Sequence, residues 1–149
     1  MKFKYILPLF IVALYACTTE KEQVLEVKSP NSEIAVNFNV NAKGKPFYTV
    51  MFNNKTVVDT SYLGFDFKDN EDFDKNFKIN NTATSSFNET WQMPWGEQLD
   101  VVNNYNELKV ELQENNEAAR SMNIVFKVYD DGIGFRYEFP EQDNFKGEV

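Results

Sequence analysis

The chain has 149 residues, an ordinary globular composition (42% hydrophobic, 26% charged) and a formal net charge of −8. Lys2 and Lys4 are the only charged residues before position 17, so the remainder carries −10, which argues against a nucleic-acid partner. The sequence has no His and one Cys, which excludes His-dependent catalytic triads, most zinc and copper sites, and intrachain disulfides. Any chemistry must come from carboxylates, Lys, Arg, Tyr or hydroxyls. The oxygen atoms among these groups suit a hard cation such as calcium.

Residues 1–16 have the layout of a secretory signal peptide: a basic start, an apolar stretch and a small-residue end. The apolar stretch over 6–14 is shorter than the roughly 20 residues of a transmembrane helix. It ends in Leu14-Tyr15-Ala16-Cys17, which resembles the lipobox of bacterial lipoproteins, where the Cys is lipidated and becomes the mature N-terminus. We therefore expect a lipid anchor on Cys17, a polar tether over 17–23, and export to the periplasmic or cell-surface side of a bacterial membrane. The alternative is an ordinary cleaved signal with an incidental Cys.

Alternation of apolar and polar residues predicts β-strands through the first half of the mature chain. The expected strands lie at 25–27, 34–40, 47–52, 56–58 and 62–67, the last with Leu63, Phe65 and Phe67 on one face. Turns are expected at 29–32, at 41–46 around Gly44, and at 53–55, where Asn53-Asn54 is of hairpin type. An acidic loop follows over 68–76, and it lacks the Gly and Glu spacing of a calcium loop.

The second half predicts strands at 77–79, 82–87, 99–102, 108–112, 122–128 and 133–139. Between them lie an irregular segment over 88–97, turns at 104–107 and at Asp130-Asp131-Gly132, and a polar loop over 114–120. We expect Gly132 to supply a positive φ. About ten short strands without helical periodicity predict an all-β fold, an antiparallel β-sandwich. Residues 24–149 form one domain without a linker or repeat, and their last segment lacks a terminating feature, so we expect an incomplete sandwich.

Two stretches carry a family resemblance. The first is SSFNETWQMPWGE over 85–97 followed by NYNEL over 104–108, and the second is NIVFKVYDDGIGFRYEFP over 123–140. Ser29-Pro30-Asn31-Ser32 and Leu63-Gly64-Phe65 fit the same pattern. From Val24 onwards the chain resembles the N-terminal domain of glycoside hydrolase family 97, the α-glucosidases and α-galactosidases of Bacteroidetes.

The resemblance implies a galactose mutarotase-like β-supersandwich that precedes a (β/α)₈ catalytic barrel and a C-terminal β-domain. In that family the catalytic and calcium-binding carboxylates lie beyond the position of Val149. The resemblance therefore implies no catalytic residue, metal site or cofactor in this chain, and calcium in the full-length enzyme. As partners it implies the barrel of the same polypeptide and an oligosaccharide.

Four residues are candidates for substrate binding. Trp91 and Trp95 flank Pro94, and aromatic faces of this kind are suited to stacking on sugar rings. Glu97 follows them and is suited to accept hydrogen bonds from sugar hydroxyls. Tyr105 lies in an Asn-Tyr-Asn-Glu cluster that is suited to the rim of a sugar site. The alternatives are a loop held in the core by the two Trp rings, an interdomain contact with the barrel, and simple turn chemistry around Tyr105.

Carboxylate pairs elsewhere favour structural roles. Asp130-Asp131-Gly132 invites a metal or acid–base interpretation but has the composition of a hairpin turn, and Arg136 and Glu138 share a strand face on which they can pair. The leading hypothesis is a non-catalytic N-terminal domain of a lipid-anchored α-glycosidase for glycan breakdown, which packs on the barrel and shapes substrate entry. The alternatives are a standalone glycan-binding surface lipoprotein and the product of a decayed gene.

Overall fold

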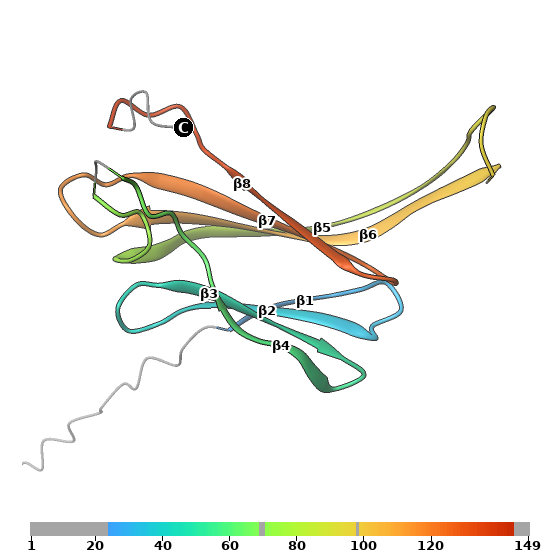
Figure 1. Ribbon diagram of the computed structural model, residues 1–149, viewed down its shortest axis with the longest axis horizontal. Coiled ribbons are helices and arrows are strands. Elements are labelled where there is room, and N and C mark those ends of the chain that lie inside the picture. The colour runs from blue at the N-terminus through green and yellow to red at the C-terminus, as the bar shows by residue number, and fades with distance from the viewer. Residues whose placement is uncertain (1–23, 69–70, 98, 145–149) are drawn as a thin grey trace, which may run out of the picture.

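Two antiparallel four-stranded sheets packed face to face make up the computed structural model, which describes residues 24–68, 71–97 and 99–144 (Figure 1). The first sheet has the order β1 (Leu25–Lys28), β2 (Ile34–Val40), β3 (Pro46–Phe52), β4 (Lys55–Tyr62). The second has the order β5 (Phe77–Gln92), β6 (Asp100–Glu114), β7 (Ser121–Tyr129), β8 (Ile133–Glu138). The predicted all-β antiparallel sandwich is confirmed.

Residues 24–144, apart from the three positions left undescribed, contain no helix that could cross a membrane. The predicted signal peptide over 1–16 and the tether over 17–23 with its Cys17 lie outside the described residues.

The core forms where the alternating apolar residues of the two sheets meet. Strands β1 and β2 of the first sheet pack on β6 and β7 of the second. Phe38 and Phe126 approach across this interface with ring centroids 6.0 Å apart, and both side chains are fully buried. The two central strands of the second sheet contribute Leu108, Val110, Leu112, Met122, Ile124, Phe126 and Val128 to this core, and Val125, on the opposite face of β7, is buried as well. The period of two read from the sequence therefore places the correct side chains inward.

The turns are mostly where the sequence predicts them. Asn53 and Asn54 have φ of 48° and 62°, the left-handed pair that a two-residue hairpin turn requires. Gly44 has φ of 73°, and a Cβ at this position would lie 2.5 Å from the Cα of Asn76, so the β2–β3 turn closes directly on the start of β5. The expectation for Gly132 is wrong: it does not have a positive φ. The turn is instead closed by the hydrogen bond from Tyr129 N–H to the Gly132 carbonyl, 2.8 Å.

The predicted strand over 62–67 is wrong. β4 ends at Tyr62, and the residues after it form a single bridge between Phe65 and Phe73. Gly64, with φ of 145°, redirects the chain so closely past Asp74 that a Cβ would lie 2.7 Å from the Asp74 Cα. Phe65 then packs on the second sheet, with its ring centroid 4.6 Å from that of Tyr137. Tertiary packing of the aromatic rings has replaced strand pairing.

The largest difference concerns β5 and β6, which form one long hairpin where the sequence predicts several short strands. Its register runs from Phe77 opposite Glu114 to Gln92 opposite Asp100. A register shift between Ile79 and Asn81 breaks the alternation, which explains why the sequence reads as two weaker strands there. Residues 104–107 lie within β6, so the predicted turn is wrong.

A buried ion pair holds the loops at one end of the second sheet. The Arg120 Nε donates to Glu114 Oε2 at 2.7 Å and Nη2 to Oε1 at 2.8 Å. The same guanidinium donates to the carbonyls of Glu71 and Asp72 at 3.1 and 2.9 Å. It also lies 4.7 Å from the ring centroid of Phe73. Arg120 therefore fastens the acidic loop, which the sequence predicts to be solvated, to the end of β6.

Candidate functional site

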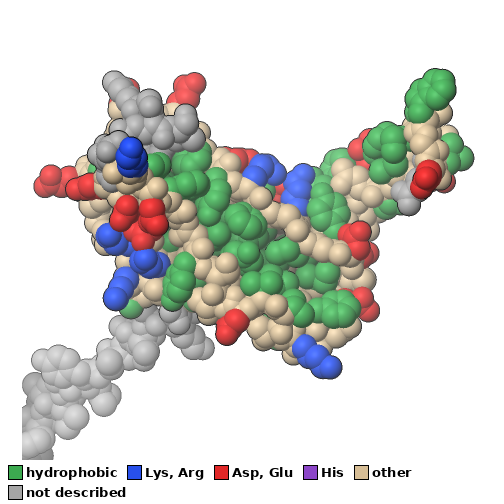
Figure 2. Space-filling model, viewed as in Figure 1, with side chains coloured by type: hydrophobic (Ala, Val, Ile, Leu, Met, Phe, Trp, Pro, Cys, Tyr) green, Lys and Arg blue, Asp and Glu red, His purple; other side chains and the backbone are tan. Residues whose placement is uncertain are grey.

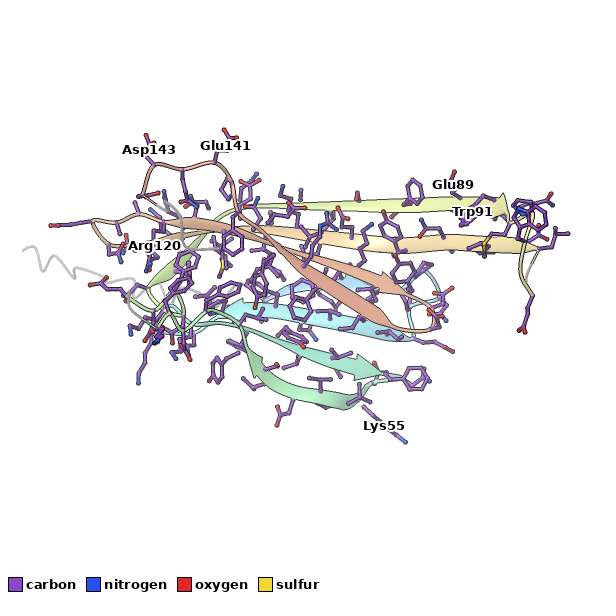
Figure 3. The ribbon with its side chains drawn as sticks, turned by 45° about the horizontal axis from the view of Figure 1, so that its top comes forward. Lys55, Glu89, Trp91, Arg120, Glu141 and Asp143 are labelled. Carbon is purple, nitrogen blue, oxygen red and sulfur yellow. The ribbon has the colours of Figure 1, made fainter. Side chains whose placement is uncertain are left out.

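The outer part of the long hairpin, residues 88–97 and 99–104, is called the distal arm. β6 pairs with β7 only as far as Tyr105, opposite Tyr129. Beyond that point β5 and β6 continue as a two-stranded ribbon that has no third strand among the described residues. Figure 1 shows the ribbon projecting past both sheets. In Figure 3, Trp91 and Glu89 lie on it, at the opposite end of the sandwich from Arg120.

Two hydrogen bonds close the arm near its tip. The Met93 N–H donates to the Leu99 carbonyl at 2.9 Å, and the Gln92 side-chain amide donates to Asp100 Oδ1 at 3.0 Å. Gly96, with φ of 125°, turns the chain at the tip. The segment over 88–97 is therefore a strand end and a turn, and the predicted irregular loop begins only after Gln92.

The arm exposes large apolar side chains. Trp95 at the tip is 84% exposed and Trp91 on β5 is 45% exposed. The others are Met93, Leu99 and Val102. Trp91 pairs with Val101 and Thr90 with Val102, so Trp91 and Val102 lie on opposite faces of the ribbon. Figure 2 shows hydrophobic side chains gathered at the projecting tip.

The charge of the arm has one sign. Its acidic residues are Glu89, Glu97 and Asp100, and the sequence over 88–104 has no Lys or Arg. Glu97 is exposed and follows Trp95 by two residues in the sequence. The structure thus brings Trp91, Trp95 and Glu97 onto one projecting element.

Tyr105 is placed differently from the other three candidates, at the base of the arm. Its ring stacks on Phe87 with centroids 5.4 Å apart and packs against Tyr129 at 5.2 Å. The Lys127 ammonium lies 4.1 Å from the ring centroid and donates to the hydroxyl at 2.8 Å. Because Tyr105 is only 9% exposed, its position suits support of the arm, and contact with a sugar stays a prediction.

The rings of Phe87, Tyr105 and Tyr129 form an aromatic ladder. A shallow pocket of about 220 Å³ lies beside it, lined by Lys127, Tyr129, Gly134 and Arg136. Arg136 Nη2 pairs with Glu138 Oε1 at 2.6 Å, as predicted, and Lys109 Nζ lies 3.2 Å from Glu138 Oε2. The hydrogen bond from Arg136 holds the pKa of Glu138 below its ordinary value. A carboxyl held ionised in this way is poorly suited to donate a proton as a general acid.

Asp74 and Asp130 also have structural partners. Lys45 Nζ lies 2.5 Å from Asp74 Oδ2, and this hydrogen bond lowers the pKa of Asp74, against the opposing effect of burial. Asp130 Oδ1 accepts a hydrogen bond from the Asn31 N–H at 2.8 Å and so ties the turns of the two sheets together. Within 24–68, 71–97 and 99–144 no group of three or more potential ligands lies close enough for a metal. Calcium in the full-length enzyme stays a prediction of the family resemblance.

Sequence reasoning does not single out Leu99 and Val102, because it places both in a short strand over 99–102. A signal was nevertheless present. Val101 and Val102 are consecutive apolar residues between Asp100 and Asn103, and consecutive strand residues point to opposite faces. A short strand with apolar residues on both faces departs from the alternation of a strand that has one buried face.

Comparison with known proteins identifies a relationship over most of the chain. The family model for the glycosyl hydrolase 97 N-terminal region matches residues 27–149. A glycoside hydrolase family 97 enzyme from Pseudoalteromonas sp. strain K8, solved in complex with panose and with acarbose, is 38% identical and has a TM-score of 0.75. The match covers 80% of this chain and 18% of that enzyme. A β-arabinopyranosidase is 29% identical with a TM-score of 0.72, over 81% of this chain and 19% of that one. The chain thus spans about a fifth of the length of these enzymes.

Proposed function

The chain belongs to glycoside hydrolase family 97, whose N-terminal domain it carries, and we propose that it serves as the non-catalytic N-terminal domain of a lipid-anchored α-glycosidase. In this role the sandwich packs against the catalytic barrel of the same polypeptide and shapes the route by which glycans enter. One observation carries the proposal: the sandwich aligns with less than a fifth of a family enzyme at 38% identity.

The state of the carboxylates supports a non-catalytic role. Glycoside hydrolysis needs one carboxyl group that can give up a proton and a second that acts across the scissile bond. Asp74 and Glu138 have lowered pKa values because Lys45 and Arg136 hold them ionised. Asp130 supports a turn. These three carboxylates are thus occupied with stabilising the sandwich.

The proposed substrates are α-linked oligosaccharides. The relative from Pseudoalteromonas was solved with panose and with acarbose, which supports an α-glucosidase. The β-arabinopyranosidase relative is less similar but shows that specificity varies among the enzymes that this domain resembles. We therefore keep α-galactosidase as the alternative activity of the full-length enzyme.

The proposed location is the periplasmic or outer face of a bacterial membrane, through lipid on Cys17. The support is the order of a basic start, a short apolar stretch and Leu-Tyr-Ala-Cys at the end of the leader. We expect Cys17→Ala to move the protein from the membrane fraction to the soluble fraction, with Cys17→Ser as a matched variant of nearly equal volume. Retention of Cys17→Ala in the membrane fraction would contradict the lipid anchor.

Activity measurements test the main proposal. The purified 149-residue chain and the longest natural polypeptide that contains it are incubated with aryl α-glucoside, aryl α-galactoside and aryl β-arabinopyranoside. We expect hydrolysis by the longer polypeptide alone. Hydrolysis by the 149-residue chain above a protein-free blank would overturn the non-catalytic role.

A standalone glycan-binding lipoprotein is the second candidate, and the exposure of Trp91 and Trp95 favours it. Titration of the 149-residue chain with panose separates it from the first. Binding that is lost in Trp95→Ala and kept in Phe52→Ala, a change at another exposed aromatic residue, would support a glycan site. Equal binding by both variants would remove the stacking role of Trp95.

A further inference from the structure

We propose that the distal arm is the element that docks this domain into the remainder of its own polypeptide. The arm inserts into an apolar groove that is bordered by Lys or Arg side chains on the catalytic part. This inference rests on the proposed function, because it requires a catalytic part in the same polypeptide.

The isolated geometry of the arm is the first reason. A two-stranded ribbon in water is marginally stable, and a third strand or a covering surface is normally needed. The arm loses its third strand at Tyr105, where pairing with β7 ends, yet it continues as a regular ladder to Gln92 opposite Asp100. A ribbon of this kind fits a partner that covers it.

The distribution of its apolar side chains is the second reason. Trp91 and Val102 lie on opposite faces, and Trp95 and Leu99 lie at the tip. A flat partner could cover only one of these faces, so the arrangement fits insertion into a groove. Exposed Trp residues are also frequent anchors of binding energy at interfaces.

A glycan fits this distribution less well. Sugar rings stack on the flat face of an aromatic side chain, and a sugar-binding platform gathers such rings on one surface. The arm divides its apolar groups between two faces, and Leu99 and Val102 are aliphatic. These two side chains contribute to burial against protein but not to stacking on a sugar.

Charge determines what must border the groove. Glu89, Glu97 and Asp100 give the arm three carboxylates and no compensating cation between residues 88 and 104. Complementary potentials across an interface fix its register and exclude wrong partners. The groove therefore carries basic side chains at its rim.

The base of the arm fixes its direction before docking. The rings of Phe87, Tyr105 and Tyr129 pack side by side across three strands, and Lys127 donates a hydrogen bond to the Tyr105 hydroxyl. An element held in its bound conformation loses less entropy on association.

The length of the relatives favours a partner within the same polypeptide. Some four-fifths of each similar enzyme lies outside the part that this chain matches. A surface joined by the same chain is present at a high effective concentration, so a docking element of modest area is sufficient.

Site-specific photocrosslinking in the longest natural polypeptide tests the proposal. The probe p-benzoylphenylalanine replaces Trp95 in one variant and Lys43 in a control, since Lys43 is exposed in the β2–β3 turn, which closes on the start of β5. We expect the Trp95 probe to crosslink to peptides from beyond residue 149 at least tenfold more than the Lys43 probe. Crosslinks confined to residues 1–149, crosslinks between two copies, or equal yields from both probes would overturn the proposal.

Two further measurements separate the possible failures. If an excess of panose suppresses the Trp95 crosslink in a variant without hydrolytic activity, the arm binds glycan and the docking role is wrong. If the polypeptide hydrolyses an aryl α-glycoside but gives no selective crosslink, the proposed function is supported and the docking role of the arm is contradicted. If the polypeptide crosslinks as expected but hydrolyses none of the three aryl glycosides, the docking role of the arm is supported and the proposed α-glycosidase activity is contradicted.

Discussion

The two halves of the β5–β6 hairpin share one hydrogen-bonded ladder but have opposite surroundings. In the inner half, residues 77–87 and 105–114, the side chains of Leu108, Val110 and Leu112 are buried between the sheets. In the distal arm, Trp91, Leu99 and Val102 are exposed. Backbone pairing runs through both halves and is interrupted only in the buried one, by the register shift between Ile79 and Asn81, so pairing cannot be the cause of the difference. The difference comes from whether a third strand and an opposing sheet are present.

This comparison separates stability from recognition within one element. The inner half stabilises the domain through burial and through the Arg120–Glu114 pair at its end. The arm contributes little to the core, so its side chains are free to serve a partner. Substitutions in the inner half should therefore lower the free energy of unfolding, and substitutions in the arm should change binding alone.

The largest effect is expected at Phe126 in the core. Phe126 is fully buried and its ring packs on Phe38, Tyr48 and Phe135, with centroids 6.0, 5.5 and 5.7 Å away. Phe126→Ala should lower the free energy of unfolding by about 3–5 kcal/mol, because a large cavity remains. Chemical denaturation followed by far-ultraviolet circular dichroism measures this loss. A decrease below 1 kcal/mol would show that the two sheets do not share a core at this residue.

Loss of the buried ion pair should follow closely. Arg120→Ala leaves the Glu114 carboxylate, whose side chain is 2% exposed, without its cation, and we expect a loss of roughly 3 kcal/mol in the same denaturation experiment. The double variant Arg120→Met with Glu114→Leu removes both charges and should recover most of this loss. If the double variant is as unstable as Arg120→Ala, the carbonyl contacts of Arg120 matter more than its pair with Glu114.

The sequence predicts the inner half well and the arm poorly, for a physical reason. Where one face is buried, alternation is clear, as at Ile34–Val40 and Ser121–Tyr129. Where both faces meet solvent or a partner, alternation disappears, so the segment over 88–97 reads as a loop. The segment over 104–107 reads as a turn because polar residues surround its one buried ring, that of Tyr105. Asn104 and Asn106 favour turns locally, but the paired strand supplies the hydrogen bonds that keep them extended.

The candidate residues show the same limit. Composition alone points to Trp91, Trp95 and Glu97, because aromatic and acidic residues beside Pro and Gly indicate a surface feature. The buried environment of Tyr105 depends on Phe87 and Lys127, which are 18 and 22 residues away in the sequence and reach it only through strand register. Likewise, neither Glu114 nor Arg120 signals its partner, because both lie in a polar run whose burial is determined by the loop around Phe73.

A smaller effect is expected where the two halves meet. Tyr105→Phe keeps the stacked ring and removes the acceptor of the Lys127 hydrogen bond, so we expect a loss of about 1 kcal/mol. Hydrogen exchange of the β6 amides should show faster exchange on the arm side of residue 105 and little change over 108–112. Tyr129→Phe, at a neighbouring ring of the same ladder, is the matched control. Equal changes in both halves of β6 would mean that Tyr105 does not separate them.

The stability of the sandwich should decrease modestly at acidic pH because of the pair between Asp74 and Lys45. The hydrogen bond from Lys45 lowers the pKa of Asp74, so this pair stabilises the fold above the ordinary carboxyl pKa. That stability is lost as the pH falls through the lowered pKa. We expect the midpoint of thermal unfolding to decrease less between pH 5 and pH 3 in Asp74→Asn than in the wild type. Lys45→Met should have the same effect, and an unchanged pH dependence in both variants would contradict the pairing.

The smallest effect on the free energy of unfolding is expected at the tip of the arm. A near-zero change there would show that the tip does not stabilise the sandwich. Trp95 is 84% exposed, so Trp95→Ala should change the free energy of unfolding of the purified chain by no more than about 0.5 kcal/mol. Both Trp residues of the chain lie on the arm, so their fluorescence reports the arm while circular dichroism reports the whole sandwich. The wild type should therefore emit at a long wavelength already in the native state, and covering the arm should shift the emission to shorter wavelengths. A loss above 1 kcal/mol in Trp95→Ala would show that the tip packs on the sandwich, and the separation between a stabilising half and a recognising half would no longer hold.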